Sequence, residues 1–125
     1  MFGASATATH SIDMASPAER KALNEDTFRN ANETLERGAK TIVGPDAQMP
    51  VPFLCECPRL ECTDVVLVTI PEYEAVRSDA RRGLAVAGHE DPAIENVVER
   101  TDRFLVTEKF GRAGEVFMET DERTR

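Results

Sequence analysis

The chain has 125 residues, and its 23 acidic and 15 basic side chains give a formal net charge of −8. A negative charge of this size repels phosphate groups and anionic lipid, so the composition argues against nonspecific nucleic-acid binding and against docking on a membrane surface. Apolar residues concentrate between Val51 and Met118, which suffices for one domain with a modest core.

The sequence also bears on the cellular compartment. No apolar run approaches the roughly 20 residues of a membrane span, and the N-terminus lacks the charged start and apolar stretch of a secretory signal. The three cysteines are an odd number, which suits a reducing compartment better than a framework of disulfides. We therefore expect a cytoplasmic protein.

Residues 1–15 are small and polar and show no periodicity, which predicts a disordered tail. Met14, which precedes Ala15, Ser16 and Pro17, is also a credible translation start. Residues 16–125 are expected to form a single α+β metal-binding domain.

A long amphipathic helix is predicted to begin after Ser16. Ser16 can cap it, Pro17 suits its first turn, and Glu19 completes a capping box. Gly38 is a natural stop. Four apolar residues recur at helical spacing and should cover the core or meet a partner, namely Leu23, Phe28, Ala31 and Leu35.

The middle of the chain is predicted to form an extended arm, a strand and a short helix. Pro45 and Pro50 mark a linker between residues 44 and 52. The apolar run at 65–68 predicts a buried strand, and a second capping box at 69–72 opens a short helix that carries Tyr73 and Val76.

The remaining residues complete an α+β fold. Strands are predicted around 84–88, 104–110 and 115–118, with a turn through 111–114 and a short helix over 92–98. The expected architecture is a long N-terminal amphipathic helix followed by a small, mostly antiparallel sheet with short inserted helices and a zinc knuckle.

All three cysteines fall in one short stretch, Cys55, Cys57 and Cys62, with the spacing C-x-C-x4-C. Thiolates are good zinc ligands, and zinc favours four nitrogen or sulfur donors in a tetrahedron. Pro58, directly after Cys57, interrupts a regular strand and lets the backbone turn between the thiols. The pattern therefore predicts a metal site, with zinc as the leading ion.

The fourth ligand is predicted to be His89, because it follows a strand and Gly88, where a turn can bring it to the thiols. His10 is the other histidine and lies in the tail. Glu56, Glu61 or a water molecule are the alternatives.

Other uses of the thiols are less consistent with the spacing. Iron–sulfur proteins of the CDGSH type also open with C-x-C, but their histidine closely follows the last cysteine, and none closely follows Cys62 here. A metal-free switch could join Cys57 to Cys62 in a disulfide. Glu56, Glu61 and Asp64 would raise the pKa of the free thiols and so favour a bound cation. A nucleophilic enzyme would need one thiol set apart beside a base.

Several motifs together resemble a family of short actinobacterial proteins of uncharacterised function. The resemblance implies a shared fold unit and a bacterial source, but no activity, and it departs at Pro58-Arg59-Leu60, where the family often carries glycine. The segments that carry it are N-E-D-T-F-R-N-A-N-E (24–33), C-E-C-x4-C (55–62), E-Y-E-x-V-R (72–77), G-H-E (88–90) and D-R-F-L-V-T-E-K (102–109).

Three functions follow from a zinc site in such a domain. The first is a non-enzymatic regulatory or protein-interaction module with structural zinc, which binds a protein partner or a second copy. The second is a thiol- or metal-responsive sensor. The third is a zinc-dependent hydrolytic enzyme in which Glu90, next to His89, acts as the general base.

Overall fold

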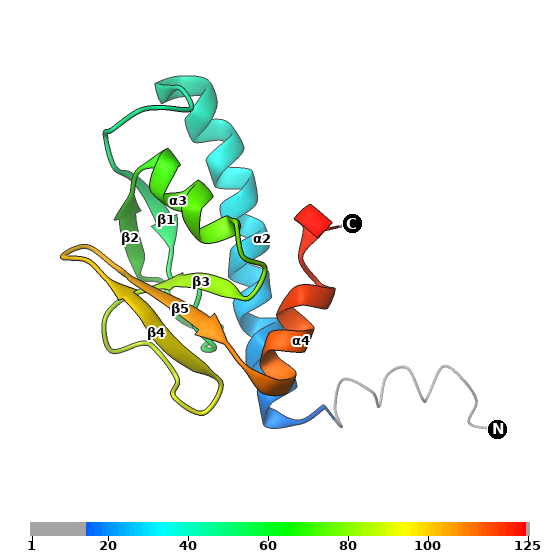
Figure 1. Cartoon of the computed structure of the whole chain (residues 1–125). Coiled ribbons are helices and arrows are strands. Elements are labelled where there is room, and N and C mark those ends of the chain that lie inside the picture. The colour runs from blue at the N-terminus through cyan, green and yellow to red at the C-terminus, as the bar shows by residue number, and fades with distance from the viewer. Residues whose placement is uncertain (1–14, 125) are drawn as a thin grey trace.

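The structure, a computed structural model that describes residues 15–124, is an α+β fold in which a long helix runs beside two small antiparallel sheets (Figure 1). One sheet pairs β1 with β2, and the other has the order β3-β5-β4. The elements are α2 (Pro17–Val43), β1 (Val51–Leu54), β2 (Val65–Val68), α3 (Ile70–Arg77), β3 (Arg82–Ala85), β4 (Glu95–Arg100), β5 (Leu105–Lys109), α4 (Gly111–Glu119) and a 3₁₀ turn (Glu122–Thr124).

Two sequence-based expectations concern the N-terminal tail and membrane-spanning segments. The predicted tail, apart from Ala15, and the alternative start at Met14 lie outside the described residues. No helix within residues 15–124 is long and apolar enough to cross a membrane.

Both predicted capping boxes are confirmed. At the start of α2 the backbone N–H of Glu19 donates to Ser16 Oγ (3.1 Å), while the N–H of Ser16 donates to Glu19 Oε1 (2.8 Å). Thr69 and Glu72 exchange the same two bonds at the start of α3, at 3.2 and 2.8 Å. Each pair satisfies backbone donors that a helix start leaves free.

The predicted end of α2 at Gly38 is wrong, because the helix continues to Val43. A single glycine inside a helix costs only about 1 kcal/mol, and the packing of Ala39 and Val43 against the core holds the extra turn in place. Gly44 ends the helix, since its φ of 89° belongs to the left-handed region that favours glycine.

The predicted apolar stripe of α2 does not cover the core. Leu23 and Leu35 are 38% and 42% exposed, Ala31 is exposed, and Phe28 is half-buried. The buried face instead carries mostly polar and charged side chains, namely Ala22, Glu25, Asp26, Arg29, Asn32, Glu33 and Glu36. Periodicity failed here because most of these polar groups, among them Glu25, Asn32 and Glu33, find partners in later parts of the chain.

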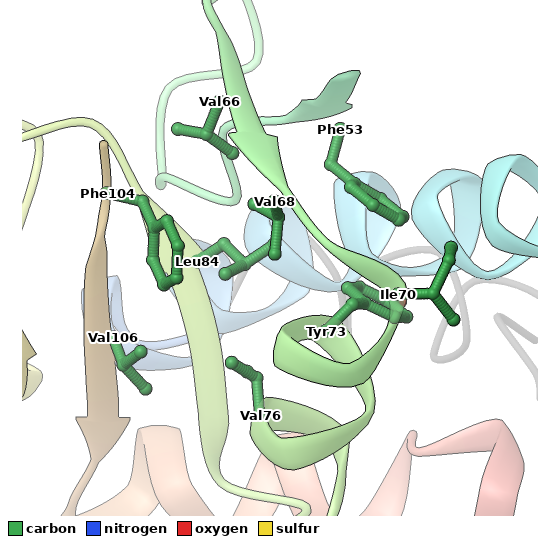
Figure 2. Close-up of a cluster of buried hydrophobic side chains, with 9 residues drawn as sticks. All are labelled: Phe53, Val66, Val68, Ile70, Tyr73, Val76, Leu84, Phe104 and Val106. Carbon is green, nitrogen blue, oxygen red and sulfur yellow. The ribbon is translucent and has the colours of Figure 1, made fainter. Parts of the chain in front are cut away.

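The largest hydrophobic cluster lies between the two sheets and α3 (Figure 2). The rings of Phe53 and Tyr73 stack with centroids 4.5 Å apart. Strand β2 faces this cluster with Val66 and Val68, whereas its alternate residues point to solvent. The cluster consists of Phe53, Val66, Val68, Ile70, Tyr73, Val76, Leu84, Phe104 and Val106.

Two later elements differ from the prediction. Residues 95–100 form β4 rather than a helix, because they pair with β5 from Glu95↔Lys109 onward. The expected last strand at 115–118 is part of helix α4. Gly114 fits there because a side chain at that position would meet the backbone oxygen of Lys109 at 3.0 Å. Short apolar runs do not distinguish strand from helix. Pairing with β5 accounts for the first difference, and α4 packs its buried face against Ala22 of α2.

A buried charge cluster, defined here as Lys109, Glu25 and Glu95, joins α2 to the three-stranded sheet. The Lys109 ammonium contacts the Glu25 carboxylate and lies 2.9 Å from Glu95 Oε1. It also donates to Thr107 Oγ1 at 3.1 Å and lies 4.5 Å from the centre of the Phe117 ring. All three charged side chains are almost completely buried, so each depends on the others for compensation.

Candidate metal centre

The cysteine segment runs between the two sheets. Cys55 directly follows β1, and its N–H donates to the carbonyl of Asp64 (3.0 Å), which extends the β1–β2 pairing by one step. The N–H of Glu56 donates to the carbonyl of Leu84 in β3 (2.9 Å). The chain from Cys55 to Cys57 is therefore bonded to both sheets.

Two turns bring the remaining candidate ligands to the same place. The N–H of Cys62 donates to the carbonyl of Arg59 (3.0 Å), which closes the loop between the second and third cysteines. After β3, the N–H of His89 donates to the carbonyl of Val86 (2.9 Å). Gly88 has a φ of 93°, so this turn uses the conformational freedom of glycine.

The structure brings Cys55, Cys57, Cys62 and His89 together, with one ligand atom from each within 4.8 Å of all the others. His89 Nδ1 lies 3.6 Å from Sγ of Cys55 and 3.6 Å from Sγ of Cys62. In a tetrahedral zinc site with Zn–S of about 2.3 Å and Zn–N of about 2.0 Å, sulfur and nitrogen lie about 3.5 Å apart. Both measured distances are close to this value, and the four donors lie closely enough together to hold one metal ion.

The sulfur atoms lie in a mainly buried environment. Cys55 and Cys57 are buried, and Cys62 is half-buried. Burial raises the pKa of the Cys55 and Cys57 thiols. The other two sulfurs add to the rise in pKa at Cys55, and Cys62 adds to the rise at Cys57. A bound divalent cation reverses this preference and displaces the thiol protons. The N–H of Val86 donates to Cys55 Sγ (3.3 Å), a bond that favours the thiolate.

The second ring nitrogen of His89 faces a carboxylate. Nε2 lies 3.3 Å from Oδ2 of Asp64, whereas the other ring nitrogen, Nδ1, is the one close to the sulfur atoms. Asp64 is about half exposed, whereas the imidazole of His89 is mostly covered. The imidazole therefore bridges the cysteine cluster and an acidic side chain.

Two of the alternative fourth ligands, Glu56 and Glu61, do not belong to this group of four donors. The Glu56 side chain is completely buried and accepts hydrogen bonds from Asn32 Nδ2 (2.7 Å) and from the N–H of Leu84 (3.1 Å). Its carboxylate is thus engaged by α2 and β3. Glu61 is exposed, and His10 lies outside the described residues.

The geometry around Glu90 bears on the hydrolytic alternative. Its carboxylate accepts a hydrogen bond from the N–H of Gly88 (2.8 Å), and backbone hydrogen bonds lower its pKa. A catalytic zinc keeps one coordination position open for water. Four protein donors around one point, with Glu90 bonded within the turn, fit a closed site better.

Sequence reasoning missed the roles of Asn32 and Asp64. Asn32 stands in the middle of a helix, where a polar residue usually points to solvent, yet it is completely buried. Asp64 was considered only for its charge, although a carboxylate close to a histidine ligand is a common partner of that histidine. The residue types of Asn32 and Asp64 allowed such roles, but the groups that they contact belong to distant segments of the chain and could not be inferred from the sequence.

The fold and the site define the class: an α+β protein with three cysteines and one histidine placed closely enough to hold one metal ion. Comparisons with protein-family models, with curated proteins and with solved structures give no match for the chain. The resemblance to short actinobacterial proteins therefore stays a prediction.

Proposed function

We propose that Cys55, Cys57, Cys62 and His89 bind one zinc ion whose role is structural. The observation that carries the proposal is the separation of 3.6 Å between His89 Nδ1 and two of the sulfur atoms, which is close to that of a zinc tetrahedron. Three thiolates and one imidazole suit zinc better than calcium or magnesium, which prefer oxygen donors.

A structural role follows from what the ion would join. The sheet β1–β2 has only two strands, and a pair of strands alone is marginally stable. Cys55 and Cys57 follow β1, Cys62 precedes β2, and His89 follows β3 of the other sheet. One ion at this point would cross-link both sheets and add folding free energy to a domain with a modest core.

We further propose that the protein is a non-enzymatic regulatory or interaction module in the cytoplasm. The net charge of −8 disfavours nucleic acid and anionic membranes and so favours a protein partner over these two. The outward face of α2, defined here as Phe28, Ala31, Leu35, Gly38 and Ile42, supports this choice. Ile42 is 84% exposed, and a Cβ at Gly38 would meet nothing within 4 Å.

The partner that fits this face is a second copy of the chain. The five residues follow the alternating spacing of three and four that helices use to pack together. In an antiparallel pair, Phe28 would lie opposite Gly38 of the second copy, and Leu35 opposite Ala31, so that large side chains meet small ones. The face spans only about 22 Å of helix, so we expect weak, concentration-dependent dimers.

The zinc proposal is tested by elemental analysis of protein purified without an affinity metal, together with its visible spectrum. One equivalent of zinc and a colourless protein are expected. An absorbing iron–sulfur chromophore, or a metal-free protein that does not take up added zinc, would overturn the proposal.

The dimer proposal is tested by sedimentation velocity over a range of concentrations. Leu35→Glu should abolish association, whereas Leu67→Glu, at a similarly exposed apolar residue on β2, should leave it unchanged. A wild-type chain that stays monomeric throughout would contradict self-association.

One observation favours a sensor as the second candidate function. Cys62 is the thiol of the cluster that is not fully buried, so a peroxide can reach it first. Oxidation would join Cys57 and Cys62 in a disulfide, reduce the peroxide to water and release the zinc. Peptide mapping after mild peroxide treatment should then find this disulfide in proportion to released zinc, whereas reduced thiols with zinc retained would exclude the sensor.

A further inference from the structure

Asp64 touches the metal centre in two ways. Its backbone carbonyl accepts the N–H of Cys55 (3.0 Å), and its carboxylate lies 3.3 Å from Nε2 of His89. Cys55 follows β1 and His89 follows β3, so a single residue contacts ligands from two separate segments.

The geometry points to Asp64 as the positioning residue of the metal centre, which orients His89 so that Nδ1 faces the metal and Nε2 carries the proton. This inference rests on the proposed zinc site. Asp64 itself provides no ligand, and it acts through the imidazole.

The chemistry of imidazole explains why such a partner matters. A neutral histidine carries its proton on one of two nitrogens, and only the other nitrogen can donate to a metal. Because a carboxylate accepts but does not donate, Asp64 requires the proton on Nε2 and leaves the Nδ1 lone pair free for the ion. The negative charge also makes the imidazole a stronger donor.

The loop around His89 makes this contact more important. His89 belongs to a short turn after Gly88, and its backbone bond to Val86 fixes the main chain but not the rotation of the ring. The sulfur atoms on one side and Asp64 on the other fix that rotation. Without Asp64, part of the binding free energy would be spent on ordering the ring.

Glu61 provides a matched control. It lies in the same loop as Asp64 and carries the same charge, and both line the open hollow beside Cys62 and His89. Within residues 15–124, no hydrogen bond or ion pair connects Glu61 to a ligand. Removal of Glu61 changes the field at the site but not the orientation of the imidazole.

The test is the zinc dissociation constant, measured by chelator competition at neutral pH for the wild type, Asp64→Ala, Asp64→Asn and Glu61→Ala. Loss of a partner of this kind typically weakens metal binding 10- to 100-fold, and we expect this for Asp64→Ala. Asp64→Asn keeps an acceptor without the charge and should fall between Asp64→Ala and the wild type. Glu61→Ala should change affinity by less than about threefold, because an exposed charge is screened by salt.

A second measurement separates positioning from a general effect on folding. In the zinc-loaded wild type, NMR of the imidazole nitrogens should show Nδ1 bound to metal and a proton on Nε2. The circular dichroism spectrum of zinc-loaded Asp64→Ala should match the wild type, because alanine retains the backbone carbonyl that accepts from Cys55.

The outcomes distinguish this inference from the proposed function. If the wild type binds zinc and Asp64→Ala binds it as tightly as Glu61→Ala, the positioning role is wrong and the zinc site stands. Zinc bound through Nε2 would also overturn it. A wild type that binds no zinc would overturn both.

Discussion

The side-chain amide of Asn32 pairs with both backbone groups of Leu54. Oδ1 accepts the N–H of Leu54 at 2.8 Å, and Nδ2 donates to its carbonyl at 3.0 Å. Asn32 thus takes the place of a neighbouring strand along the free edge of β1. Because Nδ2 also donates to Glu56 Oε2 (2.7 Å), α2 is joined directly to the segment between two metal-ligand candidates.

Asn32→Ala should therefore lower the free energy of unfolding by at least about 2 kcal/mol, since it leaves several buried polar groups without partners. Asn30→Ala is the control on the same helix, because Asn30 is exposed and bonds only to Asp26 at 3.3 Å in the described chain. Urea unfolding of the zinc-loaded proteins measures both. Equal losses of unfolding free energy in the two variants would argue against the role of Asn32 at the edge of β1.

Two glycine substitutions should have opposite signs. A Cβ at Gly83 would lie 2.9 Å from Glu56 Oε1 and 3.1 Å from Lys109 Nζ. Both side chains are completely buried, and moving them aside would disturb their hydrogen bonds and ion pairs, so Gly83→Ala should destabilise by about 1–3 kcal/mol. Gly38→Ala meets no atom and replaces a helical glycine, so it should stabilise by up to about 1 kcal/mol. Thermal unfolding of both variants checks the difference in sign.

The buried charge cluster predicts a large effect at Lys109. Lys109→Met would leave the buried Glu95 carboxylate without its cation and remove the ammonium group from the Glu25 carboxyl group, which typically costs about 3–5 kcal/mol. Lys40→Met removes a lysine that is 39% exposed and 3.7 Å from Glu36, and should cost at most about 1 kcal/mol. Chemical denaturation measures the free energy of unfolding of both variants. Similar losses would mean that Glu25 and Glu95 do not depend on Lys109 for their stability inside the fold.

The same cluster should make stability depend on pH. Burial raises the pKa of Glu25 to about 8, despite the opposing effect of Lys109, and the nearby Glu95 carboxylate adds to the rise. In the folded chain Glu25 therefore keeps a proton that it loses above about pH 4.5 in the unfolded chain. Between about pH 5 and 8, raising the pH should lower the free energy of unfolding by up to about 1.4 kcal/mol per unit.

Glu25→Gln isolates this contribution, because glutamine does not titrate. The buried Glu36, whose pKa is raised to about 7, and the buried Glu56, whose pKa is also raised, titrate in both proteins. The difference between the two stability curves, measured with zinc saturated, should decline from pH 5 to 8. Parallel curves would show that Glu25 is ionised throughout.

Metal removal should unfold the part of the chain that carries the two sheets. Cys57→Ser should act in the same way, because structural zinc supplies on the order of 10 kcal/mol of binding free energy in zinc peptides. In excess chelator, wild type and Cys57→Ser should unfold alike, because neither then holds the ion. Unchanged thermal stability of the wild type after chelation would refute a structural role.

The features predicted correctly from sequence depend on residues close together in the chain. The capping boxes at Ser16 and Thr69 involve residues three positions apart. The strand at 65–68 follows from a short apolar run, although only one of its faces is buried and not the whole strand as predicted. The cysteines lie within eight residues of each other, and His89 was found from its place after Gly88. Local geometry was sufficient for the caps and the strand, whereas His89 lies 27 residues beyond Cys62 and reaches the thiols through the fold.

The errors share a different cause. The buried face of α2 could not be inferred from periodicity, because Glu25 and Asn32 are stable inside only when Lys109 and Leu54 are in place. A helix was predicted over 92–98 because the pairing of residues 95–100 with β5 is invisible in a short window. Pattern alone does not show which polar side chains will find partners.

The polar character of the buried face of α2 has a consequence for biosynthesis. This helix is translated before the segments that cover its buried face, and Arg123, which lies 2.6 Å from Glu33, follows 90 residues later. An apolar face left uncovered for that time would promote aggregation of the nascent chain. Here the face that will be buried carries Glu25, Asp26, Arg29 and Glu33, so water can solvate it until the C-terminal residues emerge.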